Sequence, residues 1–168
     1  MTPSLIRIWL SLPTPVRTLA AKSLFEHDPN DGASRLQAEA AIARALKARD
    51  VYVRRLPEEK KVAYLATAVR PDEVLASSLL LALHLGHRRP MLAAFLDQLG
   101  IPHDNGLIAE NADLTPPDAA QLDAAAKAIY EKFPEEEVTL YLKVLMAMDG
   151  EMWGGLAATI ESRSLSPR

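Results

Sequence analysis

Hydrophobic and polar residues follow one another along this chain with the period of an α-helix. After the turn cluster of residues 28–32, apolar side chains recur every three or four positions, at Leu36, Ala40, Ala43 and Leu46, with Ile42 beside them. The same spacing returns in two later segments, at Val62, Leu65, Ala66 and Val69, and at Leu122, Ala126, Ile129 and Phe133. This pattern predicts amphipathic helices that bury one face, and the alternating pattern of strands is nearly absent.

Proline and acidic residues mark the expected starts of several helices. Pro57 is followed by Glu58 and Glu59, and the same order of residues recurs at 71–73 and 134–136. A proline is tolerated in the first turn, and carboxylates there complement the helix dipole. The segment Gly100-Ile101-Pro102 has the composition of a helix end, and residues 115–118 have that of a capping box. Residues 101–114 are therefore expected to form a polar connection with a turn at residues 103–106.

Residues 73–97 are echoed by residues 137–161, sixty-four positions later. Seven positions are identical, among them Glu73/Glu137, Gly86/Gly150 and Leu92/Leu156. Each copy has an apolar stretch that ends near a glycine and is followed by an amphipathic stretch. The echo predicts a duplicated helical hairpin, with residues 57–99 and 116–162 as two related halves. The apolar stretches of the two copies are expected to pack against each other.

The predicted fold is all-α, with about seven helices in a bundle or short superhelix. A chain of 168 residues that is 49% hydrophobic is long enough for one domain with a substantial core. We therefore expect residues 1–163 to form a single all-helical domain, and residues 164–168 to be a disordered tail.

Composition narrows the possible functions more than any motif does. The chain has no cysteine, which excludes disulfides, thiolate nucleophiles and cysteine-based metal sites. It also lacks a serine nucleophile elbow and a glycine-rich phosphate loop. The net charge of −3, with basic residues in scattered pairs, disfavours nucleic acid as a partner. No cofactor is expected, no motif assigns the chain to a family, and whether it is an enzyme is left open.

The apolar N-terminal stretch, residues 4–12, is interrupted by Arg7 and followed by Pro13. It is too short to span a bilayer, so no membrane partner is expected. As a signal peptide it lacks a basic-then-apolar order, although residues 16–21 keep a cleavage site open. A cytoplasmic location is the expectation.

A histidine group is the candidate for ligand or metal binding. His84 and His87 are three residues apart near the end of a predicted helix, so one helix face can present both imidazoles. If the chain doubles back, His103 and Asp104 supply further ligands. The alternative interpretation is that histidines are simply favoured near a helix C-terminus.

The equivalent corners of the two copies carry opposite charge, which suggests a symmetric dimer. Arg88 and Arg89 lie at the first corner, and Asp149 and Glu151 lie at the second. Exposed ion pairs contribute only about 0–1 kcal/mol, so apolar neighbours would have to supply most of the affinity. Those neighbours are Met91, Met152 and Trp153. The alternative is that the arginines cap a helix and the acidic residues face solvent.

By elimination, the sequence favours a helical protein–protein interaction module without catalytic activity of its own. Its partner is another protein or a second copy of the chain, in a homodimer. The alternative is a small-ligand or metal-binding protein, possibly an enzyme, that uses the histidine group between the two halves.

Overall fold

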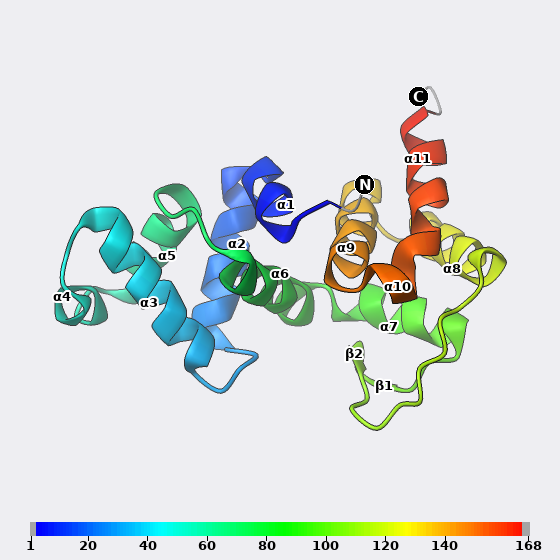
Figure 1. The fold of residues 1–168 in the computed structure, drawn as a ribbon, viewed down its shortest axis with the longest axis horizontal. Helices are drawn as coiled ribbons and strands as arrows, with labels where there is room; N and C mark the ends of the chain where they lie inside the picture. The colour runs from blue at the N-terminus through cyan, green and yellow to red at the C-terminus, as the bar shows by residue number, and fades with distance from the viewer. Residues whose placement is uncertain (1–2, 166–168) are drawn as a thin grey trace. The chain divides into compact units, whose positions relative to one another are not determined.

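The computed structural model describes residues 3–165, which form helices joined by short connections and one two-stranded β-hairpin (Figure 1). The all-α class predicted from the helical periodicity is confirmed. The chain divides into two compact units, Ser4–His87 and a second that begins at Arg88. They are called here the amino-terminal unit and the carboxy-terminal unit. The predicted single domain, and its arrangement as a bundle or superhelix, stay predictions.

Helices alone build the amino-terminal unit. They are α1 (Leu5–Ser11), α2 (Thr14–Glu26), α3 (Ala33–Leu46), α4 (Asp50–Arg54), α5 (Glu58–Thr67) and α6 (Glu73–His87). As the sequence predicts, α5 begins directly after Pro57, with Glu58 and Glu59 in its first turn. The Ser4 hydroxyl caps α1 by accepting a hydrogen bond from the Arg7 N–H. Sequence analysis did not identify α2.

The core of the amino-terminal unit is the packing of α6 against α2, and α1 and α5 add to it. Ala20 and Leu24 of α2, and Leu79 and Leu83 of α6, are completely buried. The two helices come very close at Gly86, where an added Cβ would lie 2.7 Å from the Ser23 Oγ. α6 is apolar on most of its sides because it occupies this central position.

The buried face of α3 differs from the predicted one. The helix has the expected range, but Leu36 is exposed and Ala40 and Leu46 are only half-buried. The buried residues are Ser34, Ala38, Ala41, Ile42 and Ala43, of which only Ile42 and Ala43 belong to the predicted face. These also follow helical spacing, and their small side chains let neighbouring backbones approach closely. The prediction favoured the face with the larger side chain of Leu36, but the alanine-rich face is the one that packs.

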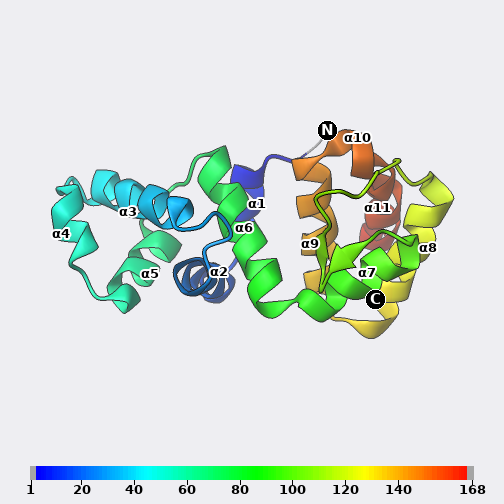
Figure 2. The same ribbon diagram turned by 90° about the horizontal axis from the view of Figure 1, so that it is seen from below.

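The carboxy-terminal unit combines helices with the hairpin. Its elements are α7 (Arg89–Leu99), β1 (His103–Asp104), β2 (Leu107–Ile108), α8 (Ala119–Lys132), α9 (Glu135–Met148), α10 (Gly150–Trp153), the 3₁₀-helix η1 (Gly154–Leu156) and α11 (Ala157–Leu165). Figure 2 shows α7 and α8 side by side, and their contact is the most extensive in this unit. α7 ends at Gly100 in the left-handed conformation, as predicted. Asp118 and Gln121 form the expected capping box of α8.

Phe95 lies at the centre of this second core. It is completely buried, with its ring 5.6 Å from that of Tyr141 in an edge-to-face arrangement and 5.9 Å from that of Trp153. Such aromatic pairs add to the free energy that burial of the rings alone contributes. They join α7 to α9 and α10.

No repeat is detected in the structure, so the predicted duplicated hairpin is not found. In the first copy α6 and α7 belong to different units, and the chain passes between them at Arg88. In the second copy a new cap at Asp149 and the pair Gly154-Gly155 divide the chain into α10, η1 and α11. The expected packing of the two apolar stretches, now α6 and α9, stays a prediction.

Two further points concern the end of the chain and membrane-spanning helices. Ser164 and Leu165, the first two residues of the predicted disordered tail, form the end of α11, and residues 166–168 lie outside the described residues. Within residues 3–165, no helix combines the length and apolar character needed to cross a membrane.

Replacing Phe95 by Ala should destabilise the carboxy-terminal unit strongly, because it leaves a cavity among packed aromatic rings. The expected loss in the free energy of unfolding is about 3–5 kcal/mol. Each unit holds one tryptophan, Trp9 and Trp153, so urea unfolding of a Trp9→Phe background reports on this unit through Trp153 fluorescence. Leu165→Ala is the control, since that side chain is 83% exposed. Equal effects of the two changes would contradict a central place for Phe95.

Tyr141 should make this unit less stable at alkaline pH. Burial raises the pKa of Tyr141 above its ordinary value of about 10. As pH rises through about 10, the unfolded chain loses the phenolic proton before the folded chain does, so the free energy of unfolding falls. Tyr141→Phe should show a shallower fall between about pH 9 and 11. Identical slopes for the two proteins in urea titrations would refute the assignment.

Candidate functional site

The four residues of the predicted histidine group are divided between α6 and β1. His84 is buried in α6, and its Nδ1 lies 2.7 Å from the Leu80 carbonyl oxygen of the preceding turn, to which it donates. His87 is exposed at the C-terminal end of the same helix. His103 and Asp104 form β1 of the carboxy-terminal unit, where Asp104 is exposed.

His103 fastens the hairpin to α7. Its Nδ1 accepts a hydrogen bond from the Gly106 N–H at 3.0 Å. The ring proton is therefore on Nε2, which lies 2.7 Å from the Asp97 carboxylate and donates to it. Both ring nitrogens are engaged in bonds that shape the protein, and a metal ion would have to displace one of them.

Within residues 3–165, no group of three or more histidine, aspartate or glutamate side chains is arranged to hold a metal ion. The positions of the four predicted ligands follow from helix and hairpin geometry instead. Metal or small-ligand binding by this group stays a prediction without a structural contact in its favour.

The two corner arginines bind within their own unit. The Arg88 side chain is only 9% exposed, and its Nε lies 3.8 Å from the Glu137 carboxylate at the start of α9. Burial lowers the pKa of Arg88, and the charge of Glu137 partly opposes that shift. Arg89 donates a hydrogen bond of 2.9 Å to the Asn105 carbonyl oxygen in the hairpin turn. Neither arginine is a simple exposed cap.

The apolar part of the predicted corner interface lies inside the protein. Met91, Met152 and Trp153 are all buried, Trp153 against the ring of Phe95. Asp149 caps α10 by accepting a hydrogen bond from the Met152 N–H, and Glu151 is exposed. The residues expected to supply most of the affinity for a partner are therefore used in the core. The reason is that helical spacing indicates a buried face but not whether the same chain or a partner covers it.

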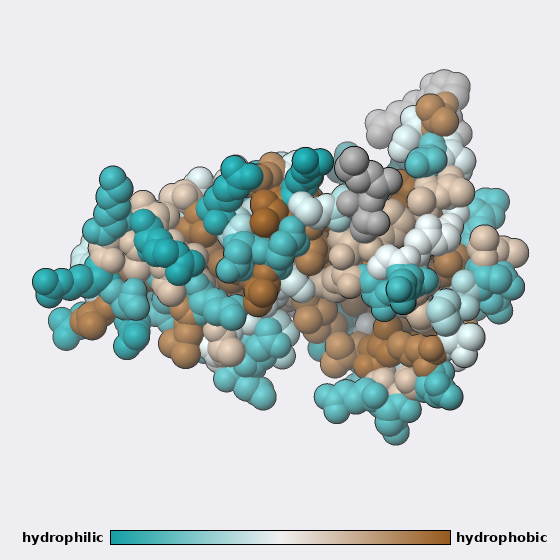
Figure 3. Space-filling model, viewed as in Figure 1, coloured by the Kyte–Doolittle hydropathy of each residue, from teal (hydrophilic) through white to brown (hydrophobic). Residues whose placement is uncertain are grey.

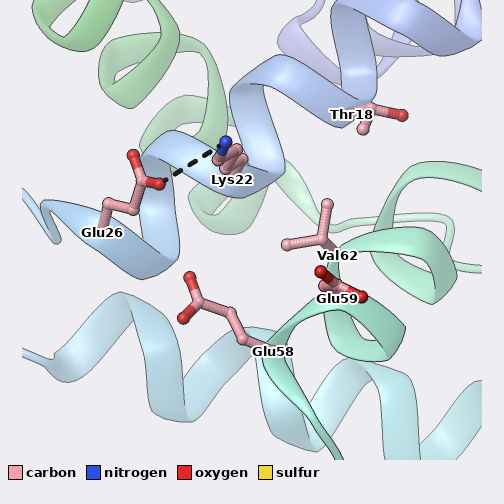
Figure 4. Close-up of a pocket in the computed structure, with 6 residues that line it drawn as sticks. All are labelled: Thr18, Lys22, Glu26, Glu58, Glu59 and Val62. Atoms are coloured by element: carbon pink, nitrogen blue, oxygen red, sulfur yellow. Dashed lines mark ion pairs between the residues drawn. The ribbon is translucent and has the colours of Figure 1, made fainter.

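A groove of about 410 Å³ runs between α2 and α5 (Figure 4). Thr18, Lys22 and Glu26 line it from α2, and Glu58, Glu59 and Val62 line it from α5. The Lys22 ammonium lies 3.8 Å from the Glu26 carboxylate, and both side chains are well exposed. The two glutamates of α5 complement its dipole. Because solvent screens all these charges, the groove lacks the dry, preorganised environment that catalysis requires.

Charge is distributed very unevenly between the two units. Residues 4–87 contain 12 Lys and Arg against 9 Asp and Glu, a formal net charge of +3. Residues 88–168 contain 7 against 13, a formal net charge of −6. The overall charge of −3 conceals this difference. Two exposed surfaces, one in each unit, carry part of these charges.

The first surface is the basic tip, at one end of the amino-terminal unit where the chain turns from α3 into α4 (Figures 1 and 2). Its basic members are all exposed, namely Arg44, Lys47, Arg49, Arg54 and Arg55, and the exposed Asp50 at the start of α4 is the one carboxylate among them. None of the five forms an ion pair with any of residues 3–165. Figure 3 shows hydrophilic residues gathered over α4. Nearby Lys61 differs, because it pairs with Glu39 at 3.3 Å.

Lys47 holds a backbone conformation that favours glycine. It ends α3 with φ +53°, and its N–H reaches the carbonyl oxygens of Ala43 and Arg44. Glycine commonly occupies this left-handed position, whereas a side chain with a Cβ costs about 1 kcal/mol there. The other non-glycine residues with positive φ within 3–165 are Asp31 and Asn105, types that tolerate it. The lysine adds charge to the tip at a cost in stability.

The second surface is the acidic loop, residues 104–118. The turn Asn105-Gly106 has positive φ at both residues, which is the usual two-residue hairpin connection. Beyond β2 the chain is irregular until α8 begins. Asp104, Glu110 and Asp113 are exposed, and no Lys or Arg occurs anywhere between residues 90 and 126.

Neither surface is evident from the net charge of the whole chain, which is −3. A count in windows would have found seven Lys and Arg within residues 44–61, and none within the following acidic stretch of residues 90–126. Comparison with protein-family models, with curated proteins and with solved structures gives no match.

Gly106→Ala should loosen the acidic loop from α7. At Gly106 φ is +93°, and an added Cβ would lie 2.8 Å from the Leu92 Cβ and 3.2 Å from the Arg89 carbonyl oxygen. Strain and overlap together should lower the free energy of unfolding by roughly 1–3 kcal/mol. Gly154→Ala is the matched control, because its added Cβ would meet nothing within 4 Å. Urea unfolding followed through Trp153 measures both, and an unchanged Gly106→Ala protein would contradict the close approach.

Proposed function

We propose that this protein is a protein–protein interaction module that associates with further copies of itself and has no catalytic activity of its own. The single observation that supports this proposal is the opposite net charge of the two units, +3 against −6. Any two copies can bring unlike units together. An encounter between copies is then attractive in some orientations although the whole chain is negative.

The ion pairs of the protein leave most of this charge available. The basic tip has no ion pair with any of residues 3–165, and the exposed acidic residues Glu110, Asp113 and Glu151 have none there either. Such charges stay hydrated in the monomer. They gain a partner only when another molecule supplies it.

Self-association should depend on protein concentration and weaken with salt. Raising the ionic strength from 0.1 M to 1 M shortens the screening length from about 10 Å to about 3 Å, which suppresses attraction between exposed charges. Sedimentation velocity at both salt concentrations should therefore show a mean mass above 18.4 kDa that grows with protein concentration only at the lower salt. Circular dichroism at each salt confirms that the helices persist. A mass of one chain under every condition would reject the proposal.

A further inference from the structure

The basic tip combines charge with exposed apolar surface. In the short helix α4, Val53 is completely buried and anchors the turn, whereas Val51 and Tyr52 are 54% and 56% exposed. Both lie between Arg49 and Arg54. An aromatic ring and an aliphatic side chain surrounded by arginines form a surface suited to an interface core with a charged rim. The helix itself does not need a valine or a tyrosine at these exposed positions.

The acidic loop also combines exposed apolar side chains with charged ones, but its charges are negative. Leu107 and Leu114 are 46% and 39% exposed, and they lie among Asp104, Glu110 and Asp113. His103 and Gly106 fix the first part of the loop to α7, so this part does not have to become ordered when it binds. Leucines within an acidic rim complement a valine and a tyrosine within a basic rim.

We propose that the basic tip of one copy docks on the acidic loop of a second copy. This inference rests on the proposed function and names the two surfaces that carry it. Arginines and Lys47 of the tip would pair with the carboxylates of the loop, and the four exposed apolar side chains would be removed from water together. A contact between Lys47 and the partner would explain why a lysine occupies a backbone position that favours glycine.

A second copy fits the tip better than a nucleic acid or an anionic membrane does. Those partners would explain the basic charge of the tip but not the acidic loop with its exposed leucines. Pairing two copies accounts for both surfaces at once. Binding of the tip to nucleic acid or to phosphatidylserine vesicles is instead a competing outcome of the test.

Two charge-reversed proteins test the docking. The tip variant carries Arg54→Glu with Arg55→Glu, and the loop variant carries Glu110→Lys with Asp113→Lys. The two new glutamates and Asp50 then balance Arg44, Lys47 and Arg49 in the tip, and the two new lysines balance Asp104 and Asp118 in the loop. Each variant therefore lacks one of the two attracting surfaces, so self-association measured by sedimentation should weaken at least about tenfold. An equimolar mixture should associate again, because the unaltered tip of the loop variant then meets the unaltered loop of the tip variant. Recovery only on mixing cannot result from misfolding of either variant.

Two further proteins control for net charge and for fold. Arg7→Glu with Arg70→Glu makes the same change in net charge as the tip variant, at exposed residues of the same unit outside the tip. It should associate like the wild type. Lys47→Gly should weaken association, whereas its urea midpoint should stay level or rise, because glycine suits the left-handed position. A purely structural role of Lys47 predicts no change in association.

The outcomes separate this inference from the proposed function. A wild type that is monomeric at every concentration overturns both. A wild type that associates equally well after tip reversal, or variants that fail to associate when mixed, overturn the docking and leave self-association in place. If the tip variant loses binding to a single-stranded oligonucleotide or to phosphatidylserine vesicles while the mixture stays monomeric, the tip serves that partner instead, and the docking is rejected.

Discussion

Burial of α6 is the constraint on which the amino-terminal unit depends. This helix has apolar residues on most of its sides, and its most extensive contact is with α2, so water would cover much of its apolar surface if α2 were displaced. At about 25 cal/mol per Å² of apolar surface, no other element of the unit offers a comparable gain from packing. The remaining helices are arranged around this pair. α5 covers α2, and α3 reaches both α5 and α6, which leaves α4 at the edge with a single buried anchor, Val53.

The sequence predicts individual helices better than it predicts which face of each is buried. Boundaries near Pro57, Gly100 and Asp118 were predicted correctly because capping chemistry is local. The buried face of α3 was predicted only in part, at Ile42 and Ala43, because periodicity alone does not decide between a leucine and a row of alanines. Whether an apolar residue meets the core or a partner is a question of tertiary contact. The spacing of Trp153 is compatible with either, and only its contact with the ring of Phe95 assigns it to the core.

The two charged surfaces could not be predicted from the sequence for a different reason. Histidine spacing suggested a metal group, but His84 bonds within α6, and His103 bonds to the hairpin turn and to α7, which gives each a structural role. The charge segregation is visible in the sequence only when charges are counted along segments. Its structural meaning required two further facts, the exposure of the charged side chains and their lack of ion pairs within residues 3–165. Neither fact follows from spacing.

The placement of unlike surfaces on different units has a consequence for the form of an assembly. A contact between a basic tip and an acidic loop joins two different patches, so each added copy leaves one patch of each kind unused unless the arrangement closes. A closed pair or ring has a fixed size. An open chain grows from its ends, and its length depends on the amount of protein present. A protein that offers only an acidic patch would then stop growth at one end without dissolving what has already formed.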